Sequence, residues 1–445
     1  MDAVLGQGAT APGWPAGPVN DQVLQYGFDP AVIAAQRTLV RGALEAAPTV
    51  SIITDQANLT NPTTGIYVNA TASGAASERP ASAEMFGAGS DDWSIAAGVR
   101  IKGGFSRGAW NPKHSMRLSF TAAYQGPLQE ELFDDDVDQF FSLDLRSEQN
   151  HSWHYGMDSE TFLRELWTRD AQLAAGEPGL RSRWVHVFVN GQYFGLYMIA
   201  ERMSQTQAAE MFGGVASDYD VIATNSDDYT YETDGDDDEW RRLWAAISDQ
   251  QISDEEMVDI AALVDLRSLA VMQLLNALTG NEDATPSAFL GELRANNWIA
   301  VRGPGSAFQF FLTDAEHSLG ANGHDVSVDR TGPFPVGAAN SFFDRAHFNP
   351  GWLFQALWQR PEYRGVFDAA AADLLADGGA LSAGPSVARW NARAAEVQPL
   401  VRAEAARWGS TQGAGPFGFD DWSDEVAWVR TEWFPARTAI VTAQL

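Results

Sequence analysis

Cysteine is absent from the 445 residues of this chain. Disulfide bridges and zinc sites with thiolate ligands are therefore excluded, and cysteine usage gives no information about the redox compartment. Long apolar runs are also absent, and no stretch approaches the roughly 20 residues that a transmembrane helix needs. The first residues lack a basic region followed by an apolar one, so no signal peptide is expected within this sequence.

Basic side chains are scarce. The chain has 29 Lys and Arg against 59 Asp and Glu, which gives a formal net charge of −30. This charge would repel the phosphates of nucleic acids and of anionic membranes, so neither is an expected partner. The alternative interpretation of this charge is that it keeps the protein soluble. Hydrophobic residues make up 45% of the chain, with 16 Trp and 24 Phe, so a large core is expected and global disorder is excluded.

Several well-known catalytic motifs are missing. The sequence has no Gly-x-Ser-x-Gly elbow and no His pair at helical spacing with Glu, which argues against a serine hydrolase and a zinc protease. It also has neither the His-Arg-Asp nor the Asp-Phe-Gly motif of ordinary protein kinases.

The two halves of the sequence have different patterns. Residues 1–48 read as an extended arm and a short helix, and residues 49–204 are rich in strand signals. The β-rich half holds one embedded helix at about 158–175, a strand signal at 65–68 and a hairpin turn at Asn190-Gly191. Residues 205–445 turn helical, with expected helices at 239–248, 254–278, 352–358, 387–408 and 420–445. The fold class predicted from this order is α+β.

Three polar residues follow apolar elements in the second half. Asp283 comes just after an apolar, helix-like run that ends near Leu278, and Asp314 comes at the end of the strand-like run 308–312. Between them, Asn296-Asn297 precedes another strand signal. Phosphoryl transfer needs one carboxylate to orient a hydroxyl, and a second carboxylate with an amide oxygen to hold Mg²⁺. The other interpretation is that these residues only end their elements, as Asp and Asn often do.

Two acidic stretches lie between the predicted helices and strands, at 134–138 and from Asp218 to Glu239. Acidic oxygens around Gly235 could wrap Ca²⁺, although the spacing does not match the twelve-residue calcium loop. A solvated loop is the alternative, and this is the interpretation that the spacing favours.

A glycine-rich turn lies between two scarce lysines. Lys102 and Lys113 bracket Gly103-Gly104-Phe105-Ser106-Arg107-Gly108. Backbone amides in such a turn can approach phosphate oxygens, and Lys supplies a compact positive charge. A surface β-turn with flanking lysines is the structural alternative.

An ordered set of segments resembles the CotH family of spore-coat, kinase-like proteins, and especially its long bacterial members in secreted or surface proteins. The set is Gly98-Val99-Arg100-Ile101-Lys102-Gly103-Gly104-Phe105-Ser106-Arg107, Pro112-Lys113-His114-Ser115-Met116-Arg117-Leu118-Ser119-Phe120, Phe162-Leu163-Arg164-Glu165, Val187 to Tyr197 with Glu201, Gly280-Asn281-Glu282-Asp283, Asn297 and Asp314-Ala315-Glu316. No single segment is decisive, but their shared order is specific and spans nearly the whole chain.

The resemblance implies an atypical protein-kinase-like, two-lobed fold, with a β-rich N-terminal lobe and a helical C-terminal lobe. It implies ATP with Mg²⁺ or Mn²⁺ as cofactors, a protein substrate, and a secreted or cell-surface location. Asp283 would be the catalytic carboxylate, and Asn297, Asp314 and Glu316 would hold the metal. Lys102, Lys113, Glu165 and Glu201 would serve nucleotide binding.

Three of these roles have explicit alternatives. Glu165 could pair with Lys113 as a kinase helix glutamate does, or with Arg169 four residues on along its own helix. Glu201 could meet the base or ribose at a hinge, or be an acid at a helix N-terminus. Glu316 would face the same side as Asp314 on a continuing strand, or instead form a salt bridge with an arginine.

One departure from the family pattern bears on function. The second Asp of the family usually follows Trp, whereas Thr313 stands there in this chain. An alternative function is therefore a non-catalytic surface or matrix module that binds a partner protein, with Ca²⁺ on its acidic loops.

Overall fold

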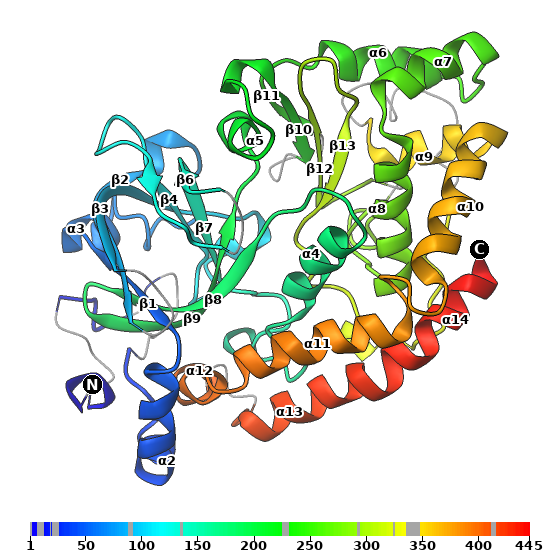
Figure 1. Cartoon of the computed structure of the whole chain (residues 1–445). Helices are drawn as coiled ribbons and strands as arrows, with labels where there is room; N and C mark the ends of the chain where they lie inside the picture. The colour runs from blue at the N-terminus through cyan, green and yellow to red at the C-terminus, as the bar shows by residue number, and fades with distance from the viewer. Residues whose placement is uncertain are drawn as a thin grey trace. The chain divides into compact units, whose positions relative to one another are not determined.

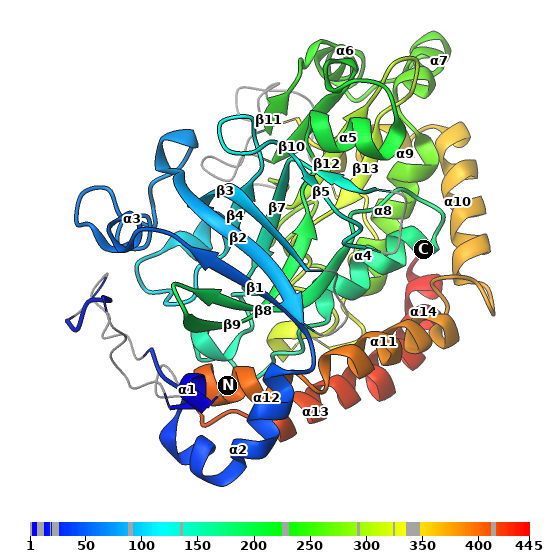
Figure 2. The ribbon, with the colours of Figure 1, turned by 60° about the vertical axis from the view of Figure 1, so that its left-hand side comes forward.

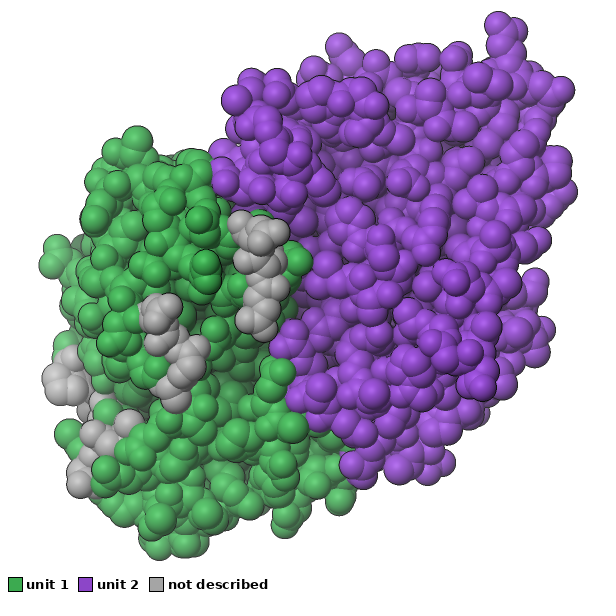
Figure 3. All heavy atoms as spheres, in the orientation of Figure 1, with its two compact units in different colours: residues 1–162, 181–202, 394–426 green, residues 163–180, 203–393, 427–445 purple. Residues whose placement is uncertain are grey.

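The structure is a computed structural model that describes residues 2–6, 13–17, 19, 26–87, 92–133, 137–224, 231–291, 294–323, 325–334, 348–410 and 415–445. The chain forms two compact units, coloured separately in Figure 3. Unit 1 comprises Met1–Phe162, Arg181–Arg202 and Ala394–Val426, and unit 2 comprises Leu163–Leu180, Met203–Arg393 and Ala427–Leu445.

In the described part of unit 1, seven strands close into a barrel in the order β1-β2-β3-β4-β7-β9-β8 (Figure 1). The strands are β1 Pro48–Ile53, β2 Arg79–Gly87, β3 Trp93–Ile101, β4 Met116–Ser119, β7 Ser142–Arg146, β8 Ser182–Val189 and β9 Gln192–Glu201. Neighbouring strands are antiparallel except β1 and β8, whose parallel pairing completes the closure. A short ribbon of β5 Leu128–Gln129 and β6 Gln139–Phe140 lies outside the barrel order.

The β8–β9 hairpin has the turn that its sequence predicts. Asn190 and Gly191 both have positive φ, of 49° and 76°, which suits the right-handed twist of the strands. Farther along the hairpin, the register shifts between Val187 and Phe188, opposite the segment around Gly195. This irregularity leaves backbone groups of β9 for partners outside the sheet.

Helix α12 Val401–Trp408 supplies those partners. Leu196 N–H donates to the Glu404 carboxylate (2.7 Å), Arg407 donates to the Tyr193 carbonyl (3.2 Å), and the Trp408 indole donates to the Phe194 carbonyl (2.8 Å). Gly195, at φ 126°, leaves the space for this contact, because a Cβ there would collide with Glu404 and Trp408.

Glu404 also binds the ammonium group of Lys113. The Nζ–Oε1 distance is 2.6 Å, Nζ donates to the Leu196 carbonyl at 2.8 Å, and both side chains are essentially unexposed. Buried charges need such pairing, since leaving one without its partner costs several kcal/mol. The pair therefore fixes α12 against the barrel.

Helix α2 Pro30–Leu44 packs beside α12, as both ribbon views show (Figures 1 and 2). Its N-cap, Asp29, accepts from two amides of the first turn, and its own N–H donates to the Ala406 carbonyl (2.7 Å). Phe28 stacks on Tyr193, so the predicted arm helix is part of the unit 1 core. The other helices of this unit are α1 Asp2–Leu5 and α3 Gln56–Thr60, and α13 Phe419–Trp428 crosses its last boundary.

In unit 2 the described strands form a four-stranded antiparallel sheet in the order β11-β10-β12-β13. They are β10 Asp220–Thr224, β11 Tyr231–Asp234, β12 Trp298–Arg302 and β13 Gln309–Leu312. The helices are α4 Arg164–Ala174, α5 Gln205–Phe212, α6 Asp238–Ile247, α7 Asp254–Leu263, α8 Leu266–Thr279, α9 Pro350–Trp358, α10 Pro361–Leu375, α11 Ala383–Val397 and α14 Phe434–Gln444. Helix α11 runs four residues into unit 1.

Helix α8 is buried along nearly its whole length, which explains why its sequence is apolar on all faces. It packs against β13, α4 and α10 (Figure 1). The edge of β13 is completed by side chains. Gln172 of α4 bonds both the Phe310 carbonyl and the Leu312 N–H, each at 2.9 Å, and Ser268 of α8 accepts from the Phe310 N–H. These bonds meet the polar groups of a buried strand edge.

The α+β class is confirmed, and the two-lobed kinase-like arrangement stays a prediction. The units cut across the predicted ranges, because the helix expected at 158–175 is α4 of unit 2, and α12 belongs to unit 1. The second half is also less helical than predicted, since it contributes a whole sheet. The polar Asp265 explains why the expected helix 254–278 is two helices: it caps α8.

The strand prediction at 65–68 is wrong. These residues form turns whose amides bond back to α3, with Ile66 donating to Asn58 and Tyr67 to Leu59. Among the described residues, no helix is both long and apolar enough to cross a membrane.

Replacing Glu404 by Gln should lower the free energy of unfolding by about 3–5 kcal/mol, because Lys113 would stay buried without its counter-charge. Urea unfolding of the full chain measures this loss. The double change Lys113→Met and Glu404→Leu removes both charges and should recover most of it. The control is Glu45→Gln, which breaks the half-exposed pair with Arg41. Equal losses for Glu404→Gln and Glu45→Gln would contradict the assignment.

Candidate functional site

The end of helix α8 delivers Asp283, as the sequence predicts. Gly280 ends the helix in the left-handed region, with φ 63°, where glycine has no steric penalty. Asn281 then accepts from the Asp283 N–H through its side chain (3.1 Å), and its own carbonyl accepts from Arg330 Nε (3.0 Å). The segment between α8 and Asp283 is thereby held at both ends.

Three side chains donate to the Asp283 carboxylate. Ser287 Oγ bonds one oxygen, and the amide groups of Asn296 and Asn297 bond the other, at 3.0 and 3.1 Å. Asp283 and Ser287 also form an isolated antiparallel bridge, so the chain turns back on itself there. The carboxylate therefore has a fixed orientation, which a catalytic group requires.

Asn297 joins the two aspartate segments. Its Nδ2 donates to the Asp283 carbonyl (2.9 Å), to the Asp283 carboxylate (3.1 Å) and to the Asp314 carbonyl (3.3 Å). Both Asn297 and Asp314 have positive φ, of 54° and 56°, a costly conformation for residues other than glycine. The predicted set Asp283, Asn297 and Asp314 is thus brought together within unit 2.

Burial changes the ionisation of this cluster. Desolvation raises the pKa of Asp283, and the Asp314 charge adds to the rise, while hydrogen bonds from Ser287 and Asn296 oppose it. His317 has a lowered pKa, again because burial disfavours the charged ring, although Asp283 and Asp314 partly offset this. A carboxylate with raised pKa in a fixed hydrogen-bond frame is typical of an acid–base group.

Glu165 of helix α4 acts on the second aspartate segment. One carboxylate oxygen accepts from the Ala315 N–H, next to Asp314, and the other accepts from Arg169 Nε at 2.7 Å. The pairing with Arg169, one of the two alternatives, is confirmed. Lys113 belongs to unit 1 and pairs with Glu404, whereas Glu165 belongs to unit 2 and pairs with Arg169. The pairing of Glu165 with Lys113 therefore stays a prediction.

The continuing strand expected for Asp314 and Glu316 is wrong. Strand β13 ends at Leu312, and the positive φ of Asp314 turns the chain out of the extended conformation. The two carboxylates therefore do not share a face by strand alternation, and Glu316 is largely buried. Among the described residues no three Asp, Glu or His side chains form a ready metal cage.

Three of the residues predicted to serve nucleotide binding, Lys102, Lys113 and Glu201, lie in unit 1, whereas Glu165 lies in unit 2. Lys102 forms an ion pair with Asp144 (3.1 Å) and keeps about 18% of its side chain exposed, whereas Lys113 is enclosed with Glu404. A phosphate contact by Lys113 would have to break that pair, whereas the ammonium group of Lys102 is partly exposed. Although burial opposes it, Arg117 and Lys102 hold the pKa of Asp144 well below its usual value.

Packing explains the glycines of the turn between these lysines. Gly103 has φ 110°, and a Cβ on it would collide with the Ser106 hydroxyl; one on Gly108 would collide with the Trp110 indole. The structural alternative for the turn thus accounts for its composition without a ligand.

Glu201 is the last residue of β9 and is buried, with its carboxylate accepting from the Arg181 N–H. The following helix α5 begins at Gln205 with Ser204 as its cap, so the alternative role at a helix N-terminus is wrong. The nucleotide role of Glu201 stays a prediction.

The described acidic residues of 218–239 serve local structure. Asp234 and Asp220 accept from the backbone amides of Gln205 and Asp236, and Asp237 pairs with Arg241 at 2.6 Å. The shorter stretch falls largely outside the described residues, at 134–136, as do residues 225–230 of the longer one.

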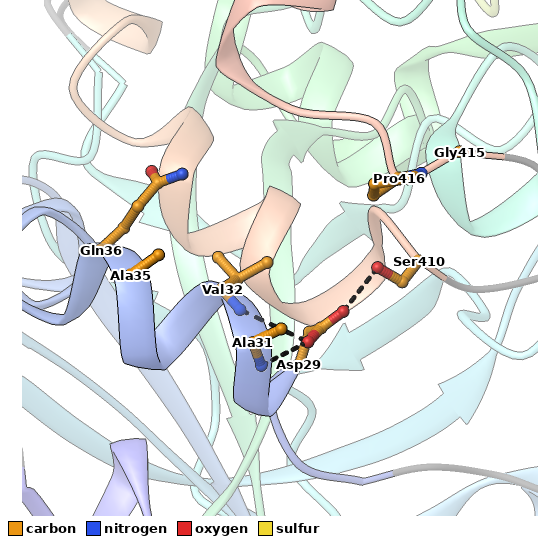
Figure 4. A pocket seen from close by; sticks show the side chains of 8 residues that line it. All are labelled: Asp29, Ala31, Val32, Ala35, Gln36, Ser410, Gly415 and Pro416. Carbon is orange, nitrogen blue, oxygen red and sulfur yellow. Dashed lines mark hydrogen bonds between the residues drawn. The ribbon is translucent and has the colours of Figure 1, made fainter.

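A cavity of about 380 Å³ lies in unit 1, at the start of α2 (Figure 4). Its lining is Asp29, Ala31, Val32, Ala35, Gln36, Ser410, Gly415 and Pro416. Figure 4 shows the Asp29 carboxylate already bonded to the Ser410 hydroxyl and to amides of the helix. With its carboxylate so occupied, this cavity offers no chemistry like that of the aspartate cluster.

Sequence reasoning missed several residues that the site uses. Ser287 gave no signal, because a lone Ser after a proline has many ordinary roles. His317 was visible beside Glu316, but the sequence does not show what it contacts, and Asn296 was visible as half of the Asn pair. Their roles depend on contacts that the local sequence does not encode.

Fold and site together define an α+β protein in which an asparagine joins two aspartate segments. The family model described as CotH kinase protein matches residues 99–440. Because the match covers most of the chain, the chain belongs to the CotH kinase protein family. No curated protein matches the sequence.

Asp283→Asn should lower the pKa of His317 further, because the carboxylate stabilises the imidazolium ion. The seven histidines can be followed by NMR titration of the imidazole signals, with His317→Asn to assign the signal. His186 of unit 1 is the control, since burial lowers its pKa to about 4 and its neighbours are unchanged. An unchanged or raised His317 pKa would show that the two groups do not interact.

Proposed function

We propose that this chain is an ATP- and divalent-metal-dependent phosphotransferase that acts on protein hydroxyl groups at the cell surface or outside the cell. The observation that carries the proposal is the Asn297 amide, which holds the Asp283 and Asp314 segments together. Membership of the CotH kinase family supports the kinase-like class. Fold alone does not fix chemistry, so the argument rests on the site.

Asp283 is the proposed base. Its carboxylate is oriented by Ser287, Asn296 and Asn297, and its raised pKa brings it closer to the range in which a base can accept a proton. Asp283 takes the proton of the acceptor hydroxyl as the hydroxyl oxygen bonds to the γ-phosphorus. The bond from that phosphorus to the β,γ-bridging oxygen breaks at the same time, and ADP leaves.

Asp314 and Asn297 are the proposed metal ligands. Asn297 uses its N–H group on protein oxygens, so its amide oxygen is the atom offered to a cation. Carboxylate and amide oxygens are the hard ligands that Mg²⁺ and Mn²⁺ accept. ATP with its metal supplies the phosphoryl group and neutralises the developing charge. Glu165 keeps the Asp314 segment in place through Ala315, which is a positioning role.

Glu316 and the residues of unit 1 have subordinate parts in this proposal. Glu316 is a metal ligand only if the cation draws it from its buried position. Lys102 is the residue proposed to bind the phosphates, and Lys113 is a buried support of β9 through the Leu196 carbonyl. Glu201 lies in sequence just before the chain passes from unit 1 to unit 2.

The alternative is a non-catalytic surface or matrix module, and Thr313 in place of the family's Trp is the observation that favours it. A binding module would keep the fold without needing nucleotide, and Ca²⁺ on the acidic stretch would be its ion. Calorimetric titration separates the two: metal-dependent ATP binding supports the enzyme, while Ca²⁺ binding without ATP binding supports the module.

Asp283→Ala should reduce phosphate transfer to protein by about 10²–10⁴-fold, the usual contribution of a general base. ATP affinity, measured by calorimetry with Mg²⁺, should stay within a few-fold of the original chain. Asp314→Asn should instead abolish the metal dependence of ATP binding. Transfer is followed with γ-labelled ATP and a mixture of protein acceptors.

The control for both changes is Asp259→Ala, since Asp259 is an exposed carboxylate on helix α7 of the same unit. Transfer that survives in Asp283→Ala and Asp314→Asn at the level of this control would refute the assigned roles.

A further inference from the structure

Phe289 is a large apolar side chain that stands in solvent beside the aspartate cluster. About 54% of its surface is exposed, although its neighbours Thr285 to Ser287 are buried. Exposing an aromatic ring forgoes the stabilisation that its burial would give. One exposed ring is common on protein surfaces, so its position must carry the argument.

The backbone of Phe289 is connected to Asp283 by two consecutive hydrogen bonds. Phe289 N–H donates to Ser287 Oγ (3.1 Å), and that hydroxyl donates to the Asp283 carboxylate. The turn between them is fixed further by Ala288 N–H, which donates to the Glu282 carbonyl at 2.7 Å. The ring is thus presented from a rigid turn that begins at the catalytic carboxylate.

The Phe289 ring also contacts the segment that follows Asp314. Phe289 packs on the imidazole of His317, with 4.6 Å between ring centroids and 45° between planes. His317 is three residues after Asp314, and its carbonyl accepts from the Glu282 N–H at 3.0 Å. Phe289 and His317 therefore form an aromatic pair that links the segments of both catalytic aspartates, with one face left to solvent.

Acidic groups outnumber basic ones among the charges that act on this pair. Asp283, Asp314 and Glu282 act electrostatically on His317, with Arg164 opposing them, and the chain as a whole carries −30. A ligand that covers the exposed ring must therefore be apolar at the contact and basic around it.

Resting on the function proposed above, we infer that Phe289 and His317 form the docking surface for the acceptor polypeptide. The acceptor class is a protein segment whose Ser or Thr has a large apolar neighbour and nearby Lys or Arg. The apolar neighbour packs on the Phe289 ring, the basic residues meet the acidic surroundings, and the hydroxyl is brought to Asp283.

Binding of fluorescein-labelled peptides to the full chain, measured by anisotropy, tests this inference without requiring turnover. The probes are a Ser peptide with Leu and two Arg, the same peptide with Leu→Ala, and the same peptide with both Arg→Glu. The first should bind about ten-fold more tightly than the second, the usual discrimination of an apolar contact, and the third should not bind measurably.

Phe289→Ala should abolish the preference for Leu over Ala, whereas Phe289→Leu should keep most of it. The matched control is Phe212→Ala, because Phe212 is another exposed aromatic residue of unit 2, packed on Tyr219. ATP affinity and the thermal midpoint of Phe289→Ala should equal those of the control, which separates lost docking from a disturbed Asp283 turn.

The outcomes separate this inference from the proposed function. If the original chain shows no preference for the Leu peptide, or if Phe289→Ala keeps the preference, the docking surface is refuted whatever the transfer assay gives. If the preference depends on Phe289 but no transfer depends on Asp283, the surface stands as a binding site and the phosphotransferase proposal fails.

Discussion

The side-chain amide of Asn297 is the contact on which the candidate site depends. One NH₂ group reaches the backbone and carboxylate of Asp283 and the carbonyl of Asp314, although these residues are 14 and 17 positions away along the chain. The left-handed conformations of Asn297 and Asp314 oppose this arrangement, so the surrounding sheet and helices must enforce it. Strands β12 and β13 pair antiparallel, which places the start of one beside the end of the other and brings both residues to the same end of the sheet.

Burial of the Asp283 carboxylate changes its ionisation. A carboxylate taken from water resists ionisation, and the pKa of Asp283 is raised even though three side chains donate to it. The hydrogen bonds therefore orient the group more than they neutralise its desolvation. Glu165 differs, because Arg169 on the same helix face forms an ion pair with it. The side chains that donate to Asp283 carry no charge, whereas the carboxylate that holds Ala315 has a charged partner.

Local patterns in the sequence predicted the features that local forces decide. The helix that ends before Asp283, the Asn190-Gly191 hairpin and the strands around Asp314 follow from periodicity and turn chemistry, and they are present. Partner choice was beyond the sequence, since Glu404 meets Lys113 across 291 positions and Glu165 meets Ala315 across 150. Only two strands of the unit 2 sheet, β12 and β13, were predicted from the sequence. Strands β10 and β11 lie in an acidic region whose polar residues hide the alternating pattern of a strand. The expected strand through Glu316 failed for a similar reason, as backbone turning at Asp314 depends on Asn297 and Glu165.

The distribution of positive charge bears on the metal dependence proposed above. Lys113 is enclosed with Glu404, Arg117 and Lys102 share Asp144, and Arg169 pairs with Glu165. These cations are already committed to carboxylates of the protein, and the chain has 30 more acids than bases. A polyphosphate would add further negative charge beside Asp283 and Asp314. Of the two lysines named here, only Lys102 has a partly exposed ammonium group. A single ammonium group cannot offset the charge of a polyphosphate. Divalent cations held by Asp314 and Asn297 would supply the missing positive charge, so in this protein metal binding and nucleotide binding should be strongly coupled.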